Sequence, residues 1–113
     1  MKILSLTILA FLTASTAVAE QRSLLAYLRV KEGSQEIFLE AAKDVIRESR
    51  QEAGNIIYNL HQSVNDPQQF VFYELFRSHE DLMFHRKAKH VISFLNKIKP
   101  ILVKDGFTLT EFR

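Results

Sequence analysis

Apolar positions along this chain recur with two periods, one typical of β-strands and one typical of α-helices. Strands are predicted where short apolar runs or alternating patterns occur, over residues 24–30, 55–62, 70–76 and 107–112. Helices are predicted where apolar side chains keep a spacing of three or four, over residues 34–53 and from Ser78 to Pro100. The elements therefore follow the order β-α-β-β-α-β.

The ends of the predicted helices carry their own signals. Ser34 is placed to cap the first helix, and Gly54 is placed to end it. Ser78 caps the second helix, with Asp81 three residues on as a short version of the capping box. A break near Lys87 would divide this second helix into two short ones.

This order of elements predicts an α+β fold of the ferredoxin-like type, in which both helices cover one face of a four-stranded antiparallel sheet. The third strand is apolar on both sides, with Phe70, Phe72 and Phe76 on one face and Val71, Tyr73 and Leu75 on the other. A lone subunit would leave one of these apolar faces exposed to water, and soluble proteins rarely expose so large an apolar surface. We therefore predict a homodimer whose subunits pack sheet to sheet.

The first residues are predicted to be a secretory signal peptide and no part of the fold. Lys2 supplies a positive charge, residues 3–12 are mostly apolar, and residues 17–19 (Ala-Val-Ala) form a cleavage site. Cleavage after Ala19 would leave one domain, residues 20–113, in the periplasm or outside the cell. The apolar stretch is shorter than the roughly 18–20 residues that span a bilayer, although a retained anchor is the alternative. The absence of cysteine suits an oxidising compartment and excludes thiolate catalysis.

Composition and charge exclude several classes of function. The 15 basic residues nearly balance the 13 acidic ones, and no basic patch for nucleic acid is visible. Only three glycines occur and none forms a G-x-G-x-x-G loop, so no flavin or nicotinamide cofactor is expected. No metal is expected either, because His85 and His90 stand five residues apart and would point about 140° away from each other on a regular helix.

Three segments carry motifs that occur together in one known family. They are Leu-Arg-Val-Lys-Glu-Gly-Ser at residues 28–34, a Tyr-x-Leu hairpin at 58–76, and two histidines separated by four residues at 85–90. In these segments the chain resembles the antibiotic biosynthesis monooxygenase family. The resemblance implies a dimeric α/β barrel, with a pocket between the sheet and the helices of each subunit. Members include cofactor-free quinol and anthrone monooxygenases and haem-degrading enzymes; the tryptophan of the family's Glu-x-Trp is Phe76 here.

Two residues are candidates for acid–base chemistry. His85 occupies the position of the family's first helix histidine, and an imidazole that titrates near neutral pH suits a general base. The alternative is a histidine that only fixes the helix on the sheet. Glu74 lies among aromatic residues of the third strand, where an unpaired carboxylate would be costly. It is either an acid–base group beside His85 or the partner of an arginine, Arg29 or Arg77.

A second set of residues is predicted to contact a substrate: Tyr27, Asn59, His61, Phe72 and Phe76. Asn59 and His61 share one face of the second strand and could equally face solvent or a partner subunit. Tyr27 could donate a hydrogen bond to a substrate oxygen, although aromatic residues at strand spacing also fill cores. These residues would form the wall of a pocket for a small aromatic molecule.

Two functions are consistent with these features. The first is a cofactor-independent monooxygenase acting on a quinol-like substrate, in which a base removes a phenolic proton and the substrate anion itself reduces O₂. The second is a non-catalytic homodimer that binds a small hydrophobic ligand in the periplasm. The missing tryptophan and the predicted export favour the second, and the helix histidine favours the first.

Overall fold

The computed structural model describes residues 3, 5, 7–10 and 19–113. Most of the predicted signal peptide lies outside these residues, so cleavage after Ala19 stays a prediction. Within the described part of the chain, no helix has the length and apolar character needed to cross a membrane.

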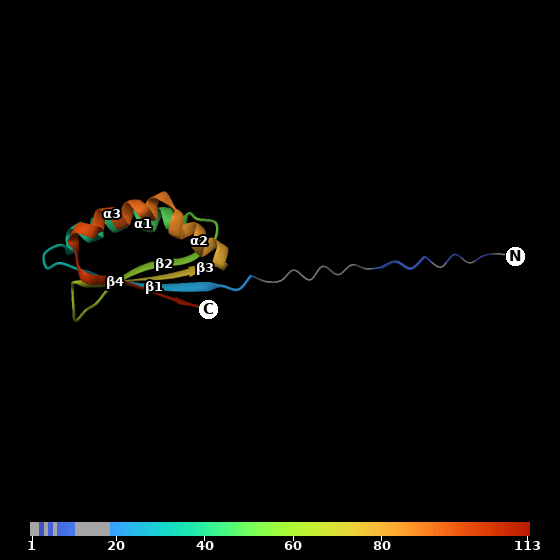
Figure 1. The fold of residues 1–113 in the computed structure, drawn as a ribbon, viewed down its shortest axis with the longest axis horizontal. Helices are drawn as coiled ribbons and strands as arrows, with labels where there is room; N and C mark the ends of the chain where they lie inside the picture. The colour runs from blue at the N-terminus through green and yellow to red at the C-terminus, as the bar shows by residue number, and fades with distance from the viewer. Residues whose placement is uncertain (1–2, 4, 6, 11–18) are drawn as a thin grey trace.

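Residues 22–112 fold into one sheet and one layer of helices (Figure 1). In chain order the elements are β1 Arg22–Val30, α1 Gln35–Arg50, β2 Asn55–Gln62, β3 Gln69–Phe76, α2 His79–Lys87, α3 Lys89–Ile98, a 3₁₀ turn at Lys99–Ile101, and β4 Leu102–Phe112. This confirms the predicted β-α-β-β-α-β order, with the second helix divided close to the predicted break.

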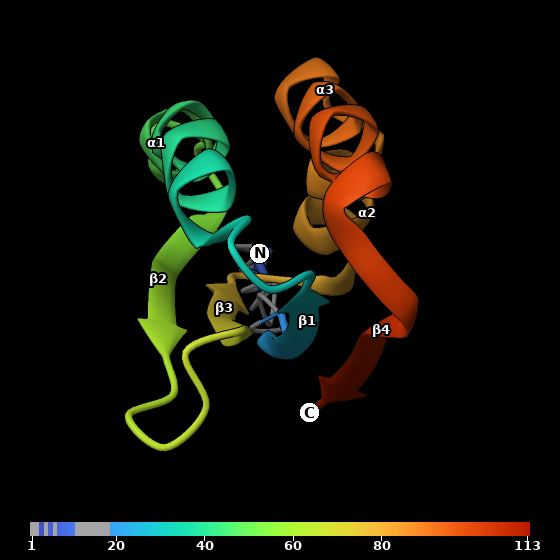
Figure 2. The same cartoon turned by 90° about the vertical axis from the view of Figure 1, so that its left-hand side faces the viewer.

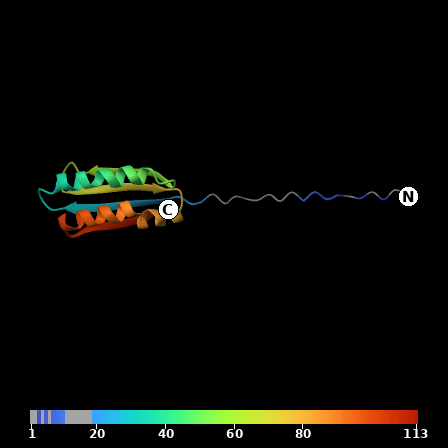
Figure 3. The same ribbon diagram turned by 90° about the horizontal axis from the view of Figure 1, so that it is seen from above.

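The sheet has the spatial order β2-β3-β1-β4, and every neighbouring pair is antiparallel. All three helices lie on one face of it, with α1 beside α3 in the view from the end of the sheet (Figure 2) and in the view from above (Figure 3). The α+β ferredoxin-like fold predicted from the sequence is therefore the fold of the chain.

The core lies between the helices and the sheet. Alternate residues of β1 and β3 point into it, as the period of two along a strand requires. Phe38 of α1 packs against Phe70 and Phe94, with ring centroids 4.2 and 5.8 Å away. The main buried cluster consists of Ala26, Leu28, Val30, Phe38, Ala42, Val45, Tyr58, Phe70, Phe72, Phe94 and Ile98.

The helix ends confirm one capping prediction and correct two others. The Ser78 hydroxyl accepts a hydrogen bond from the backbone N–H of Asp81, as predicted. Ser34 makes no such bond with its side chain, and α1 ends at Arg50 instead of continuing to residue 53. Gly54 is not a left-handed helix stop; it is needed because a Cβ there would overlap the side chain of Asp81.

The break between α2 and α3 is a single residue in extended conformation. Ala88 has φ −66° and ψ 142°, so it ends one helix and begins the next. The axis therefore changes direction between His85 and His90, and their relative orientation differs from that on a continuous helix. This residue decides the geometry of the site described below.

The last strand begins five residues earlier than its apolar alternation predicts, at Leu102 instead of Phe107. Backbone pairing extends it, since Leu102 pairs with Val30 across an irregularity between Leu28 and Val30. Asp105 has a positive φ of 57° at this irregularity. Pairing through the backbone leaves no trace in the hydrophobic pattern, so the sequence showed only the second half of the strand.

Candidate active site

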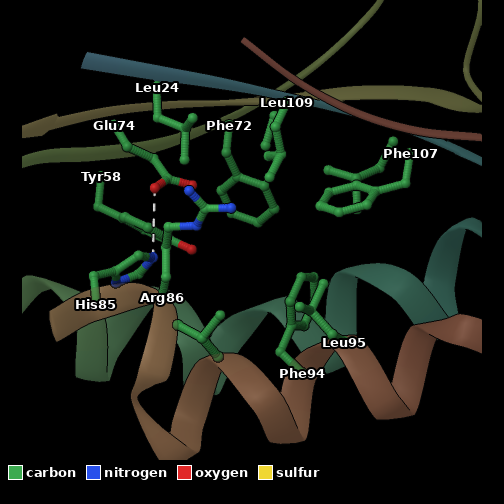
Figure 4. A pocket seen from close by; sticks show the side chains of 13 residues that line it. Leu24, Tyr58, Phe72, Glu74, His85, Arg86, Phe94, Leu95, Phe107 and Leu109 are labelled. Atoms are coloured by element: carbon green, nitrogen blue, oxygen red, sulfur yellow. Dashed lines mark ion pairs between the residues drawn. The ribbon is translucent and has the colours of Figure 1, made fainter. Parts of the chain in front are cut away.

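A cavity of about 260 Å³ lies between the sheet and the helices α2 and α3 (Figure 4). Its walls are mostly apolar. It is lined by Leu24, Ala26, Leu28, Tyr58, Phe72, Glu74, His85, Arg86, Val91, Phe94, Leu95, Phe107 and Leu109. An engineered cavity of about 150 Å³ holds one benzene ring, so this volume suits a molecule of one or two rings.

The strand register explains why these side chains converge. Phe107 and Leu109 of β4 pair with Leu28 and Ala26 of β1, which places all four on the face that the helices cover. Phe107 and Leu109 lie at the edge of the sheet and keep 38% and 40% of their surface exposed. The cavity is therefore open to solvent beside β4 and closed at the end where Glu74 and His85 lie.

The closed end holds two buried ionisable groups in contact. His85 Nε2 is 3.4 Å from Glu74 Oε2, and both side chains are at least 96% buried, with exposures of 3% and 4%. Figure 4 shows the two side chains facing each other from α2 and β3. Burial, together with the charge of Glu52, raises the pKa of Glu74 to about 8, and Arg86 opposes this rise. Glu74 therefore carries a proton at neutral pH.

The other nitrogen of His85 contacts a second buried carboxylate. His85 Nδ1 is 2.7 Å from Oε2 of Glu52, which lies in the turn after α1 and is 5% exposed. In the tautomer in which Nδ1–H donates to Glu52, the lone pair of the ring is on Nε2. The lone pair faces Glu74 and the cavity, which is the orientation a general base needs.

The same carboxylate oxygen contacts a second histidine. His90 Nε2 of α3 is 2.6 Å from Glu52 Oε2, and His90 Nδ1 is 3.6 Å from Glu48 Oε2. On a continuous helix His90 would point away from His85, but the break at Ala88 turns its ring toward Glu52. The prediction that the two histidines point about 140° away from each other is therefore wrong, since both rings contact the same oxygen of Glu52.

The three ligand-type atoms of Glu52, His85 and His90 lie within 4.8 Å of one another. Two ligands of one tetrahedral ion, at about 2.1 Å from it, stand about 3.4 Å apart. The two contacts of Glu52 are shorter than this and have the length of charge-assisted hydrogen bonds. The arrangement thus fits shared protons better than a shared metal.

Two further side chains shape the closed end. Tyr58 is 3% exposed, and its ring lies 5.3 Å from that of His85. Burial and the neighbouring Glu74 raise the pKa of Tyr58, so its phenol stays neutral. Arg86 follows His85 on α2 and extends into the cavity, where its guanidinium points toward Glu74 (Figure 4). Among the described residues that line the cavity, Arg86 is the one arginine or lysine.

The structure brings some of the predicted site residues together and separates others. His85, Glu74 and Phe72 line the cavity. Phe76 does not line it and instead packs against the His85 ring, with centroids 4.8 Å apart.

Tyr27, Asn59 and His61 lie on the opposite face of the sheet. Tyr27 is on β1 between the inward-facing residues Ala26 and Leu28, and it is 41% exposed. Asn59 and His61 alternate with the inward-facing Tyr58, so they also point away from the helices. None of the three reaches the cavity, and the Asn59 side chain accepts a hydrogen bond from Arg50 instead.

Neither arginine proposed as a partner for Glu74 contacts it. Arg29 pairs with Asp66 in the hairpin turn, and Arg77 pairs with Asp81 at the start of α2. The structure places Glu74 beside His85 instead, and its role in acid–base chemistry stays a prediction.

Sequence reasoning missed Glu52. Buried positions of α1 follow steps of four and three, from Phe38 through Ala42, Val45 and Ser49. The next step of three falls on Glu52, so a carboxylate continues the buried stripe. A charged residue at such a position must find partners, and that signal could have been read from the sequence.

The comparisons with known proteins concern the family and the fold of the chain. Residues 22–97 match the family model described as "Antibiotic biosynthesis monooxygenase". A relative from Bacillus subtilis (strain 168), named "Putative monooxygenase YcnE", is 34% identical over 79 residues, which is 70% of this chain and 83% of the relative.

Solved structures share the fold. The "Putative antibiotic biosynthesis monooxygenase from Nitrosomonas europaea" has a TM-score of 0.79 at 23% identity, over 83% of this chain and 89% of that chain. Rv0793 from Mycobacterium tuberculosis has a TM-score of 0.77 at 19% identity, over 83% of this chain and 94% of that chain. With the family model and the sequence relative, these findings lead to one conclusion. The chain belongs to the antibiotic biosynthesis monooxygenase family.

Proposed function

We propose that this protein is a cofactor-independent monooxygenase that acts on a small aromatic, quinol-like substrate, with His85 as the general base. One observation carries the proposal: Nε2 of the buried His85 lies beside Glu74 at the closed end of an apolar cavity large enough for a two-ring molecule. The family match and the name of the Bacillus subtilis relative support the reaction class.

The cavity contains the groups that such a reaction needs: apolar walls, a base and a cation. Aromatic and aliphatic walls favour a flat apolar ring and exclude water from it. His85 Nε2 takes the proton of a phenolic hydroxyl group, and the Arg86 guanidinium balances the charge of the phenolate that remains. Glu74, which is protonated, can donate a hydrogen bond to a substrate oxygen without adding a second negative charge.

The substrate then performs the redox chemistry. The phenolate passes one electron to O₂, and the resulting radical pair forms a carbon–oxygen bond. The peroxide takes a proton back from His85 and loses water as a carbonyl group forms. The substrate gives up four electrons as its reacting carbon becomes a carbonyl group, and O₂ takes up the same four electrons as it becomes the carbonyl oxygen and one water, so the reaction balances without a bound cofactor.

Oxygen uptake with a panel of reduced naphthoquinones tests the proposal. The comparison is between the wild type, His85→Asn and the control His79→Asn, because His79 is a half-exposed histidine of the same helix outside the cavity. Loss of a general base lowers the rate by about 10²-fold or more, whereas the control keeps wild-type activity. Equal rates in wild type and His85→Asn would remove His85 from the mechanism.

The alternative is a ligand-binding protein without turnover. It is supported by Phe76 replacing the family's tryptophan, since Phe76 offers no N–H donor behind His85. The same experiment separates the two functions: a naphthol that binds in the cavity, together with no oxygen uptake by any quinol of the panel, would favour the binding protein.

We also propose that two copies pack through the uncovered face of the sheet. The outward residues of β1 and β3 include Leu25, Tyr27, Val71, Tyr73 and Leu75, and no helix of the described chain covers them (Figure 2). Burying this apolar surface against a second copy would remove it from water.

A further inference from the structure

A second group of ionisable side chains continues from the cavity to the outside of the helix layer. We propose that Glu52 and His90 form, with His85, a proton path between the closed end of the cavity and a solvent-open groove beside α1. The use of this path in turnover rests on the proposed function, whereas the path itself depends on no particular substrate.

The two contacts of Glu52 with the histidines have the distances of hydrogen bonds. Both histidines share one carboxylate oxygen, Glu52 Oε2, at 2.7 Å for His85 Nδ1 and 2.6 Å for His90 Nε2. Each ring has its second nitrogen near another carboxylate, 3.4 Å from Glu74 for His85 and 3.6 Å from Glu48 for His90. An imidazole that receives a proton on one nitrogen can release one from the other, so both rings are oriented to pass protons on.

Side-chain exposure increases in order along the path. His85 is 3% exposed, Glu52 is 5% exposed, His90 is 15% exposed and Glu48 is 49% exposed. His85 lines the cavity, whereas Glu48, Glu52 and His90 line an open groove that shares no lining residue with the cavity. The three groups therefore connect two separate spaces through the packed helix layer.

A purely structural role explains Glu52 less well. Its Oε1 has no hydrogen-bond partner among the described residues, which costs free energy that a tightly packed apolar side chain would not cost. A purely structural role therefore leaves the buried, unpaired Oε1 without a compensating contact.

The transfer steps balance without any additional reactant. When His85 Nε2 takes a proton from the substrate, His85 Nδ1 releases its own proton to Glu52. The proton held between Glu52 Oε2 and His90 Nε2 then moves onto Nε2, and His90 Nδ1 releases its own proton toward Glu48 and water. The reverse sequence returns the proton when the peroxide is protonated, so the complete reaction releases no net proton.

Proton exchange with water tests the path without a substrate. In protein labelled with ¹⁵N at histidine, NMR saturation transfer gives the exchange rate of the His85 ring proton. We expect rapid exchange in the wild type and at least about tenfold slower exchange in His90→Gln, because the buried proton would then require local opening of the structure. Glu52→Gln is expected to act in the same way, and the control His79→Gln to exchange like the wild type.

Chemical rescue distinguishes transfer from support of the fold. His90 borders an open groove, so free imidazole added to His90→Ala can occupy the vacated space and restore rapid exchange. Restored packing alone would not do so, and adding benzene in place of imidazole is the matched control.

Three results would overturn the proposal. One is exchange that is equally fast in the wild type, His90→Gln and Glu52→Gln. Another is a wild-type His85 ring proton that exchanges with water as slowly as the backbone amide protons of the core. The third is stoichiometric Zn²⁺ binding by the wild type that His90→Gln loses, since a bound ion would occupy the same ring nitrogen. If the exchange rates are as predicted but no quinol of the panel supports oxygen uptake, the proposed reaction is refuted and the proton path is not.

Discussion

Replacing Glu74 with glutamine should remove a large pH dependence of stability. Burial raises the pKa of Glu74 from 4.5 to about 8, so between these values the folded protein keeps a proton that the unfolded chain has lost. The free energy of unfolding therefore falls as pH rises through this window, by about 1.4 kcal/mol per pH unit. Glutamine has nearly the same shape and does not titrate.

The expected magnitude follows from the width of the window. Between about pH 5.5 and 7.5, the wild type loses roughly 3 kcal/mol relative to Glu74→Gln. Residue 74 has the same ionisable neighbours in both proteins, namely Glu52, Tyr58, His85 and Arg86, so the difference between the two curves reports the titration of Glu74. Urea unfolding across this pH range, at one fixed protein concentration, gives both curves.

A difference in unfolding free energy that stays constant over the whole pH range would contradict the raised pKa, because Glu74 would then titrate alike in the folded and the unfolded protein. The raised pKa would also be contradicted if the wild type gains stability relative to the variant as pH rises. That result would mean that the folded protein holds Glu74 ionised, in conflict with its burial.

Three shorter predictions concern other parts of the chain. Gly54→Ala forces Asp81 out of its hydrogen bonds with Ser78 and Arg77. Thermal unfolding should show that the free energy of unfolding falls by about 1–2 kcal/mol, whereas the control Ala53→Gly should not show this loss. Tyr73→Lys places a charge on the uncovered sheet face, so sedimentation should show a lighter species than the wild type; identical sedimentation would contradict dimerisation through this face. Export should yield a mature protein that begins at Glu20, which N-terminal sequencing of the periplasmic fraction checks; an uncleaved chain there would refute the cleavage site.

The fold could be predicted from the sequence because each element buries one patterned face. The spacing of apolar residues in the sequence predicts the inward faces of β1 and β3 and the buried stripe of α1. The first part of β4 does not, because residues 102–106 are held by backbone pairing and a left-handed Asp105, which leave no hydrophobic pattern.

The site was only partly predictable for a different reason. His85, Glu74 and Phe72 were placed through the family resemblance and the strand alternation. The alternation along β2 correctly predicts that Asn59 and His61 share one face, but it does not tell which face borders the pocket, and the pocket lies on the other one. The pairing of His90 with Glu52 depends on one extended residue, Ala88, whose effect on helix direction cannot be calculated from spacing.

A crystal structure with a bound hydroxynaphthalene tests the central claim most directly. We predict the ring inside the cavity between Phe72 and Phe94, with its hydroxyl oxygen within about 2.6–3.2 Å of His85 Nε2. A ring bound elsewhere, or bound in the cavity with its oxygen turned away from His85, would contradict the assignment of this cavity as the active site.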